Sequence, residues 1–352
     1  MTNKKLVSLT AVAAVLVGLA YLSTTRKTVK TPSLVGKPVL TDFDLSDVAK
    51  IEAGTTGGKK LMLESTDAGW AIKSLYGYPA DIAKIRENLL KLKDLKVGHV
   101  AAGKKLDNPA LVDLQNAAGK SLATLRLGDK HMRQPAGEMA QFGGGAFPDG
   151  RYVSAAGSDT AVLVKETLEA FDGDPKAWTD TQICSVPAAD ITAIELSRDG
   201  KTARLTKQDG AWTIDGLGAK EEFDASKSYG VESALNYLNF NAVADPALTD
   251  AQLGMATGAV YKVSLKSGES YTAKIGNAAE GGADRYFKIS AAFTPAGTNA
   301  TENAELAKKV ETFNTKTAKW TYVIPSYNAE NMTKTRSDLV KAKEEPKKEE
   351  TK

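Results

Sequence analysis

The chain has 352 residues, of which 42% are hydrophobic and 25% charged, as is usual for globular proteins. Its formal net charge is only +3, acidic and basic residues are interspersed, and aromatic residues make up 7%, so nucleic-acid binding is not expected. The single cysteine, Cys184, excludes an intramolecular disulfide, and neither histidine has a Cys or His partner at metal-ligand spacing.

The first apolar segment is a candidate membrane anchor. Residues 6–22 form an uncharged run after Lys4 and Lys5, and as a helix this run spans about 25 Å, at the short end for crossing a bilayer. We expect a retained signal anchor, because small residues near the end of the run make only a poor cleavage site; a cleaved signal peptide is the alternative. The prediction is therefore a cytoplasmic stub at 1–5, a transmembrane anchor at 6–22 and a polar linker at 23–40.

The short stub also predicts the orientation of the chain. Long domains translocate largely regardless of their charge, so the body is expected on the periplasmic or extracytoplasmic side. The sequence thus predicts a single-pass protein of the cytoplasmic membrane, which contacts that membrane through its N-terminal helix.

Ordered landmarks recur along the rest of the chain and indicate an internal duplication. The matched segments are 47–52 with 190–195, 69–72 with 210–214, 81–84 with 224–227, 87–95 with 232–240, 127–128 with 275–276, 151–153 with 285–287, and 176–179 with 318–321. In this alignment the four tryptophans form two equivalent pairs. The predicted copies are residues 41–182 and 183–326, followed by a polar disordered tail at 327–352.

Each copy is predicted to have an α+β fold. The short runs 49–53, 60–64 and 70–73 are separated by glycine-containing turns, which is typical of an antiparallel meander. Asp81 is expected to cap a helix with apolar residues at three- and four-residue spacing, and Asp224 the corresponding helix of the second copy. The predicted fold is a transmembrane helix followed by a tandem duplication of a mainly antiparallel sheet, packed with one or two helices per copy.

No catalytic motif is found in the sequence. Gly-x-Ser-x-Gly, His-Glu-x-x-His and a Walker loop are absent, and the glycines at 143–145 lack the Lys-Ser/Thr of a phosphate loop, so we interpret them as a flexible loop. Asp42 and Asp44 are too few for a calcium loop and are expected in a capping turn. We predict a protein that is not an enzyme and has no catalytic residues, no cofactor and no metal site.

The loop before the first helix is the candidate site of contact with another protein. Tyr76, Tyr78 and Pro79 form an amphipathic stretch that the corresponding segment of the second copy, near 216–222, lacks. A feature present in one copy of a duplication is less needed by the shared fold than a feature of both. The alternative interpretation is a local packing cluster.

Several landmarks together resemble a known family. They are the Lys-Lys pair with its apolar helix, the start from Asp42-Phe43-Asp44 to Ile51-Glu52, and the segments 69–72, 74–81, 92–98, 151–153 and 174–178. With them the chain resembles the bacterial domain-of-unknown-function family 4340, over nearly its whole length. That family has no established activity and no assigned catalytic residues. Its members often accompany ABC-type export systems of the kind linked to gliding motility, so the resemblance implies an accessory role in the envelope.

These features together predict a non-enzymatic, membrane-anchored extracytoplasmic interaction module. It would be an accessory part of an ABC-type transport or envelope complex, with an ABC transporter permease or other envelope proteins as partners. The alternative is a small-molecule or glycan-binding module that uses a cleft between the two copies, where tryptophans would stack on the ligand.

Overall fold

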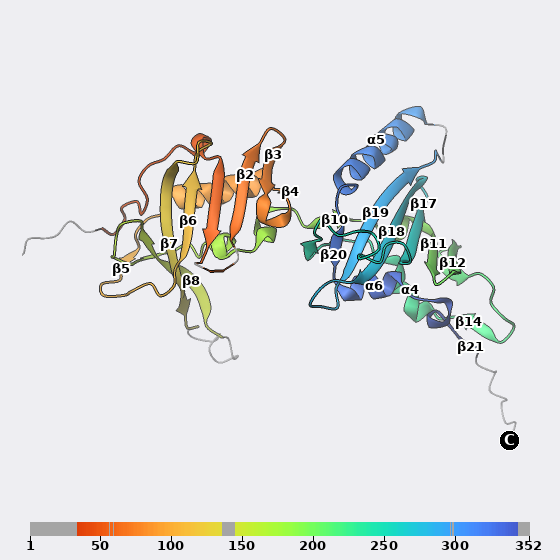
Figure 1. The fold of residues 1–352 in the computed structure, drawn as a ribbon. Helices are drawn as coiled ribbons and strands as arrows, with labels where there is room; N and C mark the ends of the chain where they lie inside the picture. Colours follow the sequence, from red (N-terminus) through yellow and green to blue (C-terminus); the bar gives the residue numbers. More distant parts are fainter. Residues whose placement is uncertain are drawn as a thin grey trace, which may run out of the picture.

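The computed structural model describes residues 34–135 and 145–343, apart from residues 56, 59, 296 and 298. In these residues the chain forms two lobes, each built on a mainly antiparallel sheet with few helices, so the fold is of the α+β kind (Figure 1). None of the described helices is long and apolar enough to cross a membrane. The segments predicted as stub and anchor lie outside the described residues.

The first lobe is built around a nine-stranded sheet with the order β4-β3-β2-β1-β6-β7-β8-β9-β5. Its strands are β1 (Lys50–Gly54), β2 (Leu61–Thr66), β3 (Gly69–Ile72), β4 (Tyr78–Pro79), β5 (His99–Val100), β6 (Ala110–Gln115), β7 (Ser121–Arg133), β8 (Phe147–Ala155) and β9 (Val162–Val164). Its 3-10 turns are η1 (Leu45–Asp47), η2 (Lys73–Leu75), η3 (Glu169–Asp172) and η4 (Pro175–Trp178). Strands β1 to β3 pair in sequence order, as the predicted meander requires.

Helix α2 (Ile82–Lys93) packs on this sheet and begins where the sequence predicts. The carboxylate of Asp81 accepts a hydrogen bond from the backbone N–H of Ala83 at 2.8 Å, which satisfies one of the free donors of the first turn. Ile85, Leu89 and Leu92 are buried in the same core as the strands. The helix therefore covers the sheet with one apolar stripe.

The second lobe contains an eight-stranded sheet with the order β13-β12-β11-β17-β18-β19-β20-β16. Its strands are β11 (Ile191–Arg198), β12 (Lys201–Gln208), β13 (Ala211–Ile214), β16 (Ala242–Val243), β17 (Ala259–Leu265), β18 (Glu269–Ala278), β19 (Arg285–Phe293) and β20 (Tyr322–Ile324). The remaining elements are β10 (Gln182–Cys184), η5 (Ala188–Asp190), β14 (Glu221–Phe223), η6 (Ala225–Lys227), α4 (Ser228–Glu232), β15 (Leu238–Asn239), α5 (Ala300–Thr317), α6 (Ser326–Met332), η7 (Arg336–Asp338) and β21 (Val340–Ala342). Strand β10 pairs with β15, and β14 with β21.

Eight strands follow one another in the same order in the two large sheets, and β4, at the edge of the first sheet, has no counterpart in the second. The matched strands are β1, β2, β3, β5, β6, β7, β8 and β9 with β11, β12, β13, β16, β17, β18, β19 and β20, respectively. A register shift also recurs, between Leu127 and Lys130 in β7 and between Ile275 and Ala278 in β18. A β-bulge changes the direction in which nearby side chains point. Because it occurs at corresponding positions in β7 and β18, residues beside it can be compared one by one between the two sheets.

The expected equivalence of Trp178 with Trp320 is wrong. Trp178 follows β9 at the end of η4, whereas Trp320 precedes β20 and follows the long helix α5. The first lobe has only a short turn between β8 and β9 at the place of α5, so the similar residues around the two tryptophans occupy different positions. Trp70 and Trp212 do lie in corresponding strands, β3 and β13.

The helix expected after Asp224 is much shorter than α2. Asp224 does cap a turn, since its carboxylate accepts from the backbone N–H of Ser226 at 3.1 Å, but that turn is the 3-10 turn η6. Helix α4 then ends at Glu232. Glycine at position 230 is unfavourable in a helix interior, which is one reason why the second helix does not extend.

The folded body continues past the boundary predicted at residue 326. Helix α6 and strand β21 follow, and the side chains of Met332 and Leu339 are fully buried. The expectation of a disordered tail is therefore wrong for residues 327–343, because a few well-placed apolar side chains anchor a segment of polar composition. Residues 344–352 lie outside the described part.

Candidate functional site at the junction of the two lobes

Tyr78 lies where the two lobes meet. It belongs to β4, at the edge of the first sheet, and is only 3% exposed. Its ring centroid lies 5.2 Å from that of Phe240, 4.9 Å from that of Trp320 and 6.4 Å from that of Tyr322, all in the second lobe. Phe240 and Tyr322 stack on each other at 5.5 Å. We call these four rings the junction cluster.

The turn before β4 directs Tyr78 toward the second lobe. Tyr76 and Gly77 both have positive φ, 55° and 81°. Glycine adopts this conformation freely, whereas it costs a residue such as tyrosine roughly 1 kcal/mol or more. The backbone N–H of Gly77 donates to the carbonyl of Ile72 at 2.9 Å, and Tyr78 then pairs with Ile72 across β3. This reversal buries Tyr78 and leaves Tyr76 49% exposed.

The chain segment between the lobes is hydrogen-bonded to the first lobe around the predicted site. The backbone N–H of Asp81 donates to the carbonyl of Trp178 at 2.8 Å. The hydroxyl of Thr179 donates to the carbonyl of Pro79, also at 2.8 Å. These bonds hold the start of the connecting segment, which Figure 1 shows in green between the lobes, against β4 and α2.

The same segment is tied to the second lobe a few residues later. The backbone N–H of Phe240 donates to the carbonyl of Thr181 at 3.0 Å. The ammonium of Lys316 donates to the carbonyl of Gln182 at 3.2 Å and lies 3.6 Å from the carboxylate of Asp180. The connection is thus a structured contact between the lobes.

Burial holds two tyrosines and the cysteine near the junction in their neutral forms. Burial raises the pKa of Tyr78 and of Tyr322 above the ordinary value for tyrosine, because the charged phenolate loses its hydration. Burial likewise raises the pKa of Cys184 to about 12. A thiol that stays protonated is a weak nucleophile, so the junction is chemically a packing contact.

The three residues predicted as a protein contact site therefore separate in the structure. Tyr78 contacts the second lobe of its own chain, while the side chains of Tyr76 and Pro79 are exposed beside it. Contact with another protein stays a prediction for the exposed pair. The sequence comparison missed the partners of Tyr78, since they lie far along the chain and no local pattern links them.

The alternative expectation was a ligand cleft between the two copies. Five cavities in the described part of the chain are each lined by residues of a single lobe. Trp178 is fully buried, and its indole N–H donates to the carbonyl of Ala170 at 2.8 Å. Trp70, Trp212 and Trp320 are half-buried and pack against the core.

Other polar residues considered in the sequence form hydrogen bonds within the fold. Asp44 caps η1 by accepting from the backbone N–H of Ser46 at 2.9 Å, as expected. His131 is hydrogen-bonded to Asp149 on neighbouring strands. No group of three His, Cys, Asp or Glu side chains able to hold a metal ion occurs within the residues that the structure describes. Of the glycine loop at 143–145, only the last residue falls inside the described part.

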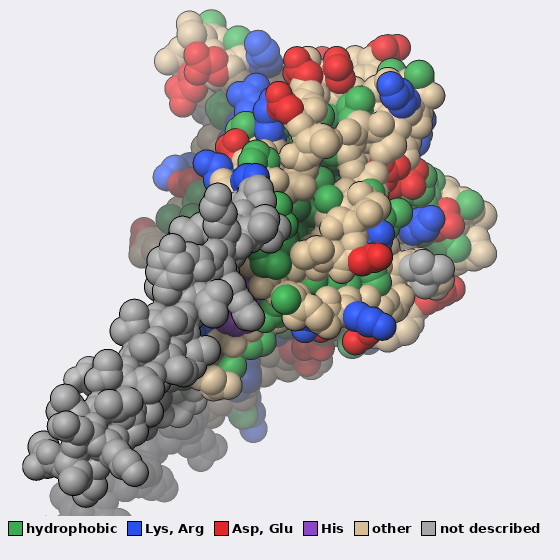
Figure 2. Space-filling view, turned by 90° about the vertical axis from the view of Figure 1, so that its left-hand side faces the viewer, with side chains coloured by type: hydrophobic (Ala, Val, Ile, Leu, Met, Phe, Trp, Pro, Cys, Tyr) green, Lys and Arg blue, Asp and Glu red, His purple; other side chains and the backbone are tan. Residues whose placement is uncertain are grey.

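Charged side chains on the first lobe are mixed. On the side that faces the viewer in Figure 2, basic and acidic groups alternate with hydrophobic ones, and neither sign dominates. A binding face for nucleic acid would need a concentrated basic patch. This side therefore gives no support to that class of partner.

The fold and its junction define a two-lobed α+β protein with two antiparallel sheets of matching topology. A family model described as a domain of unknown function (DUF4340) matches residues 70–257, more than half of the chain, and the chain belongs to this family. The matched span includes β4, the connecting segment and Phe240. Comparison with curated proteins and with solved structures finds no match.

Proposed function

We propose that this chain is a non-enzymatic, membrane-anchored interaction module on the extracytoplasmic side of the cytoplasmic membrane. The observation that carries the proposal is the junction cluster, which joins two duplicated lobes into one body and leaves Tyr76 exposed at its edge. The apolar run at residues 6–22, after Lys4 and Lys5, supplies the anchor.

Tyr76 has the properties of a contact residue. A tyrosine offers a broad apolar ring and a polar tip, and such residues dominate the energy of many protein interfaces. Its backbone is fixed by the left-handed turn next to Gly77, so little further ordering is needed on binding. The adjoining Pro79 is also exposed and conformationally restricted.

The partner we propose is an ABC transporter permease or another envelope protein. The support is the company in which members of this family are found, together with an anchor that would hold the body near such a complex. A ligand-binding role in a cleft between the copies is the less favoured function, because the five cavities described above are each lined by residues of a single lobe.

The proposal is tested by cross-linking in intact membranes, followed by purification of the full-length chain and mass spectrometry. The expected result is the chain with residues 1–22 retained, in the membrane fraction, joined to a permease or another envelope component. Recovery of the chain in the soluble fraction without its first 22 residues would contradict the anchor. Recovery from membranes without any envelope partner would contradict the interaction role.

A further inference from the structure

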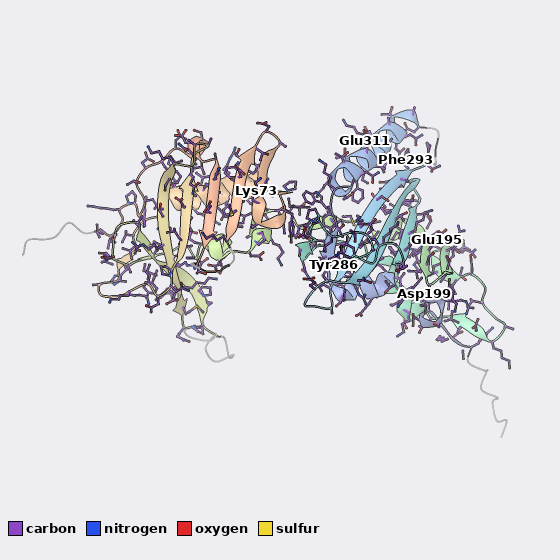
Figure 3. All side chains as sticks on the ribbon, in the orientation of Figure 1. Lys73, Glu195, Asp199, Tyr286, Phe293 and Glu311 are labelled. Atoms are coloured by element: carbon purple, nitrogen blue, oxygen red, sulfur yellow. The ribbon has the colours of Figure 1, made fainter. Side chains whose placement is uncertain are left out.

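Each lobe has a cavity at the same end of its sheet. The first, of about 340 Å³, is lined by the end of β1, the start of β6, the middle of β7 and β8 at their register shift, and η3. The second, of about 320 Å³, is lined by the corresponding ends of β11, β17, β18 and β19 and by α6. In Figure 3, Asp199 and Tyr286 mark this end of the second sheet, and Phe293 marks the opposite end.

The cavity of the first lobe contains an arginine that the chain itself neutralises. The side chain of Arg151 is 8% exposed and forms an ion pair with Asp172 of η3. It also donates to the carbonyl of Gly128 at 2.9 Å and to that of Thr167 at 3.2 Å. Lys130, opposite Arg151 on β7, lies 3.1 Å from the same Asp172 carboxylate. A carboxylate is therefore the group that this arginine position binds.

In the cavity of the second lobe, the corresponding arginine has no such ion pair. Arg285 holds the register position of Arg151, since Arg151 pairs with Val164 on β9 and Arg285 with Ile324 on β20. Ala278 stands opposite it, where the first lobe has Lys130. Within the described residues, no Asp or Glu forms an ion pair with Arg285, which is exposed and lines the cavity.

We propose that the cavity of the second lobe binds a small carboxylate ligand, with Arg285 as the anchoring cation. The planar guanidinium matches a carboxylate with two parallel hydrogen bonds. A volume of about 320 Å³ lies at the lower end of the range for small-molecule sites. Asn277, Ser326 and Thr333 add hydrogen-bonding groups, and Glu330 adds a negative charge. Arg198 also lines the cavity but is paired with Asp199 at 3.4 Å, which leaves Arg285 as the cation without an ion pair among the described lining residues. Glu330 favours carboxylates that also carry a hydroxyl or ammonium group.

Two variants of the exposed residue Ala278 test whether Arg285 binds a ligand or is simply a solvent-exposed side chain. Ala278→Glu places a carboxylate directly across the strand pair from Arg285 and gives it an ion-pair partner, as Asp172 does for Arg151 from a different position. Ala278→Gln adds a side chain of the same shape without the charge. If Arg285 binds the ligand, the first variant blocks binding and the second does not.

The measurement is ligand-detected NMR titration of the full-length chain in detergent, with acetate, lactate and glycine as probes and acetamide as the neutral isostere of acetate. We expect saturable binding of at least one carboxylate and none of acetamide. Ala278→Glu and Arg285→Gln should each weaken it roughly tenfold or more, and Ala278→Gln much less. Equal binding by the Glu and Gln variants, tight binding of acetamide, or no saturable carboxylate binding would overturn the proposal.

A control variant on the same strand excludes a general charge effect. Lys288→Gln removes a cation from β19 that is paired with Asp250, 2.7 Å away, and does not line this cavity. It should leave carboxylate binding unchanged. Far-UV circular dichroism of all four variants shows whether each is folded, and equal loss of binding in Lys288→Gln and Arg285→Gln would count against a site at Arg285.

Discussion

The rings of Tyr78 and Trp320 lie 4.9 Å apart with an angle of 58° between their planes. One belongs to an edge strand of the first sheet and the other precedes a strand of the second. Aromatic pairs at such tilted geometries are favourable beyond the area that they bury. The contact therefore links two lobes that a connecting segment alone would leave free to separate.

Replacement of the ring of Tyr78 should loosen this junction. We expect Tyr78→Ala to destabilise the chain by roughly 3–5 kcal/mol, because it empties a packed aromatic site. Tyr78→Phe keeps the ring and should cost far less. Urea unfolding measures the loss, and small-angle scattering should show a larger radius of gyration only for the alanine variant. An unchanged unfolding midpoint in Tyr78→Ala would show that the lobes are held by other contacts.

The two corresponding arginines should differ sharply in their effect on stability. Arg151→Gln removes a buried guanidinium that pairs with Asp172 and donates to the carbonyls of Gly128 and Thr167, and losing these bonds should cost roughly 1–3 kcal/mol. Arg285→Gln changes an exposed side chain and should stay within about 0.5 kcal/mol. Thermal or urea unfolding of the two variants, side by side, makes the comparison. Similar losses for both would mean that Arg285 also has a structural partner.

Cys184 should resist thiol reagents while the chain is folded. Its pKa is raised from the ordinary value of 9.0 to about 12 by burial, so the folded thiol ionises only at high pH. The unfolded chain releases this proton at lower pH, so the associated stability is complete below about pH 9 and disappears as the pH rises toward 12. Labelling with a chromogenic disulfide at pH 8 should be slow without denaturant and fast with it. Fast labelling of the native chain would contradict the described burial.

The ion pair between Glu221 and Arg336 should be visible in an acid titration. The hydrogen bond from Arg336 lowers the pKa of the Glu221 carboxyl from 4.5 to about 2. The stabilisation is present above pH 4.5 and is lost as the pH falls through about 2. NMR titration of the carboxyl carbon measures this pKa directly, and Arg336→Gln should return it toward 4.5. A normal pKa in the unmodified chain would mean that the pair does not persist in solution.

Local features of the fold could be predicted from the sequence, because neighbouring residues determine them. The cap at Asp81 and the meander around Trp70 depend on side chains within a few positions of each other. The sequence also matched Arg151 with Arg285, and the two arginines lie on corresponding strands of the two sheets. In contrast, the ion pair of Arg151 with Asp172 required the path of the chain after β9 to be known.

The predictions that were wrong depended on local similarity or on composition alone. Trp178 and Trp320 have similar neighbours, but α5 lies before only one of them. The polar segment after residue 326 folds because Met332 and Leu339 are buried, and two such residues barely alter its composition. The partners of Tyr78 come from distant segments of the chain, so no local pattern could identify its contact with the second lobe. Contact of Tyr76 and Pro79 with another protein stays a prediction.

The most direct measurement is site-specific photo-cross-linking in living cells, with a photoreactive phenylalanine at position 76 or at position 229. Tyr229 is the matched control, an exposed tyrosine on α4 of the second lobe. We expect a cross-link from position 76 to a permease or another envelope protein, stronger than any from position 229. Equal cross-links from both positions, or none from position 76, would contradict an interaction surface at the junction.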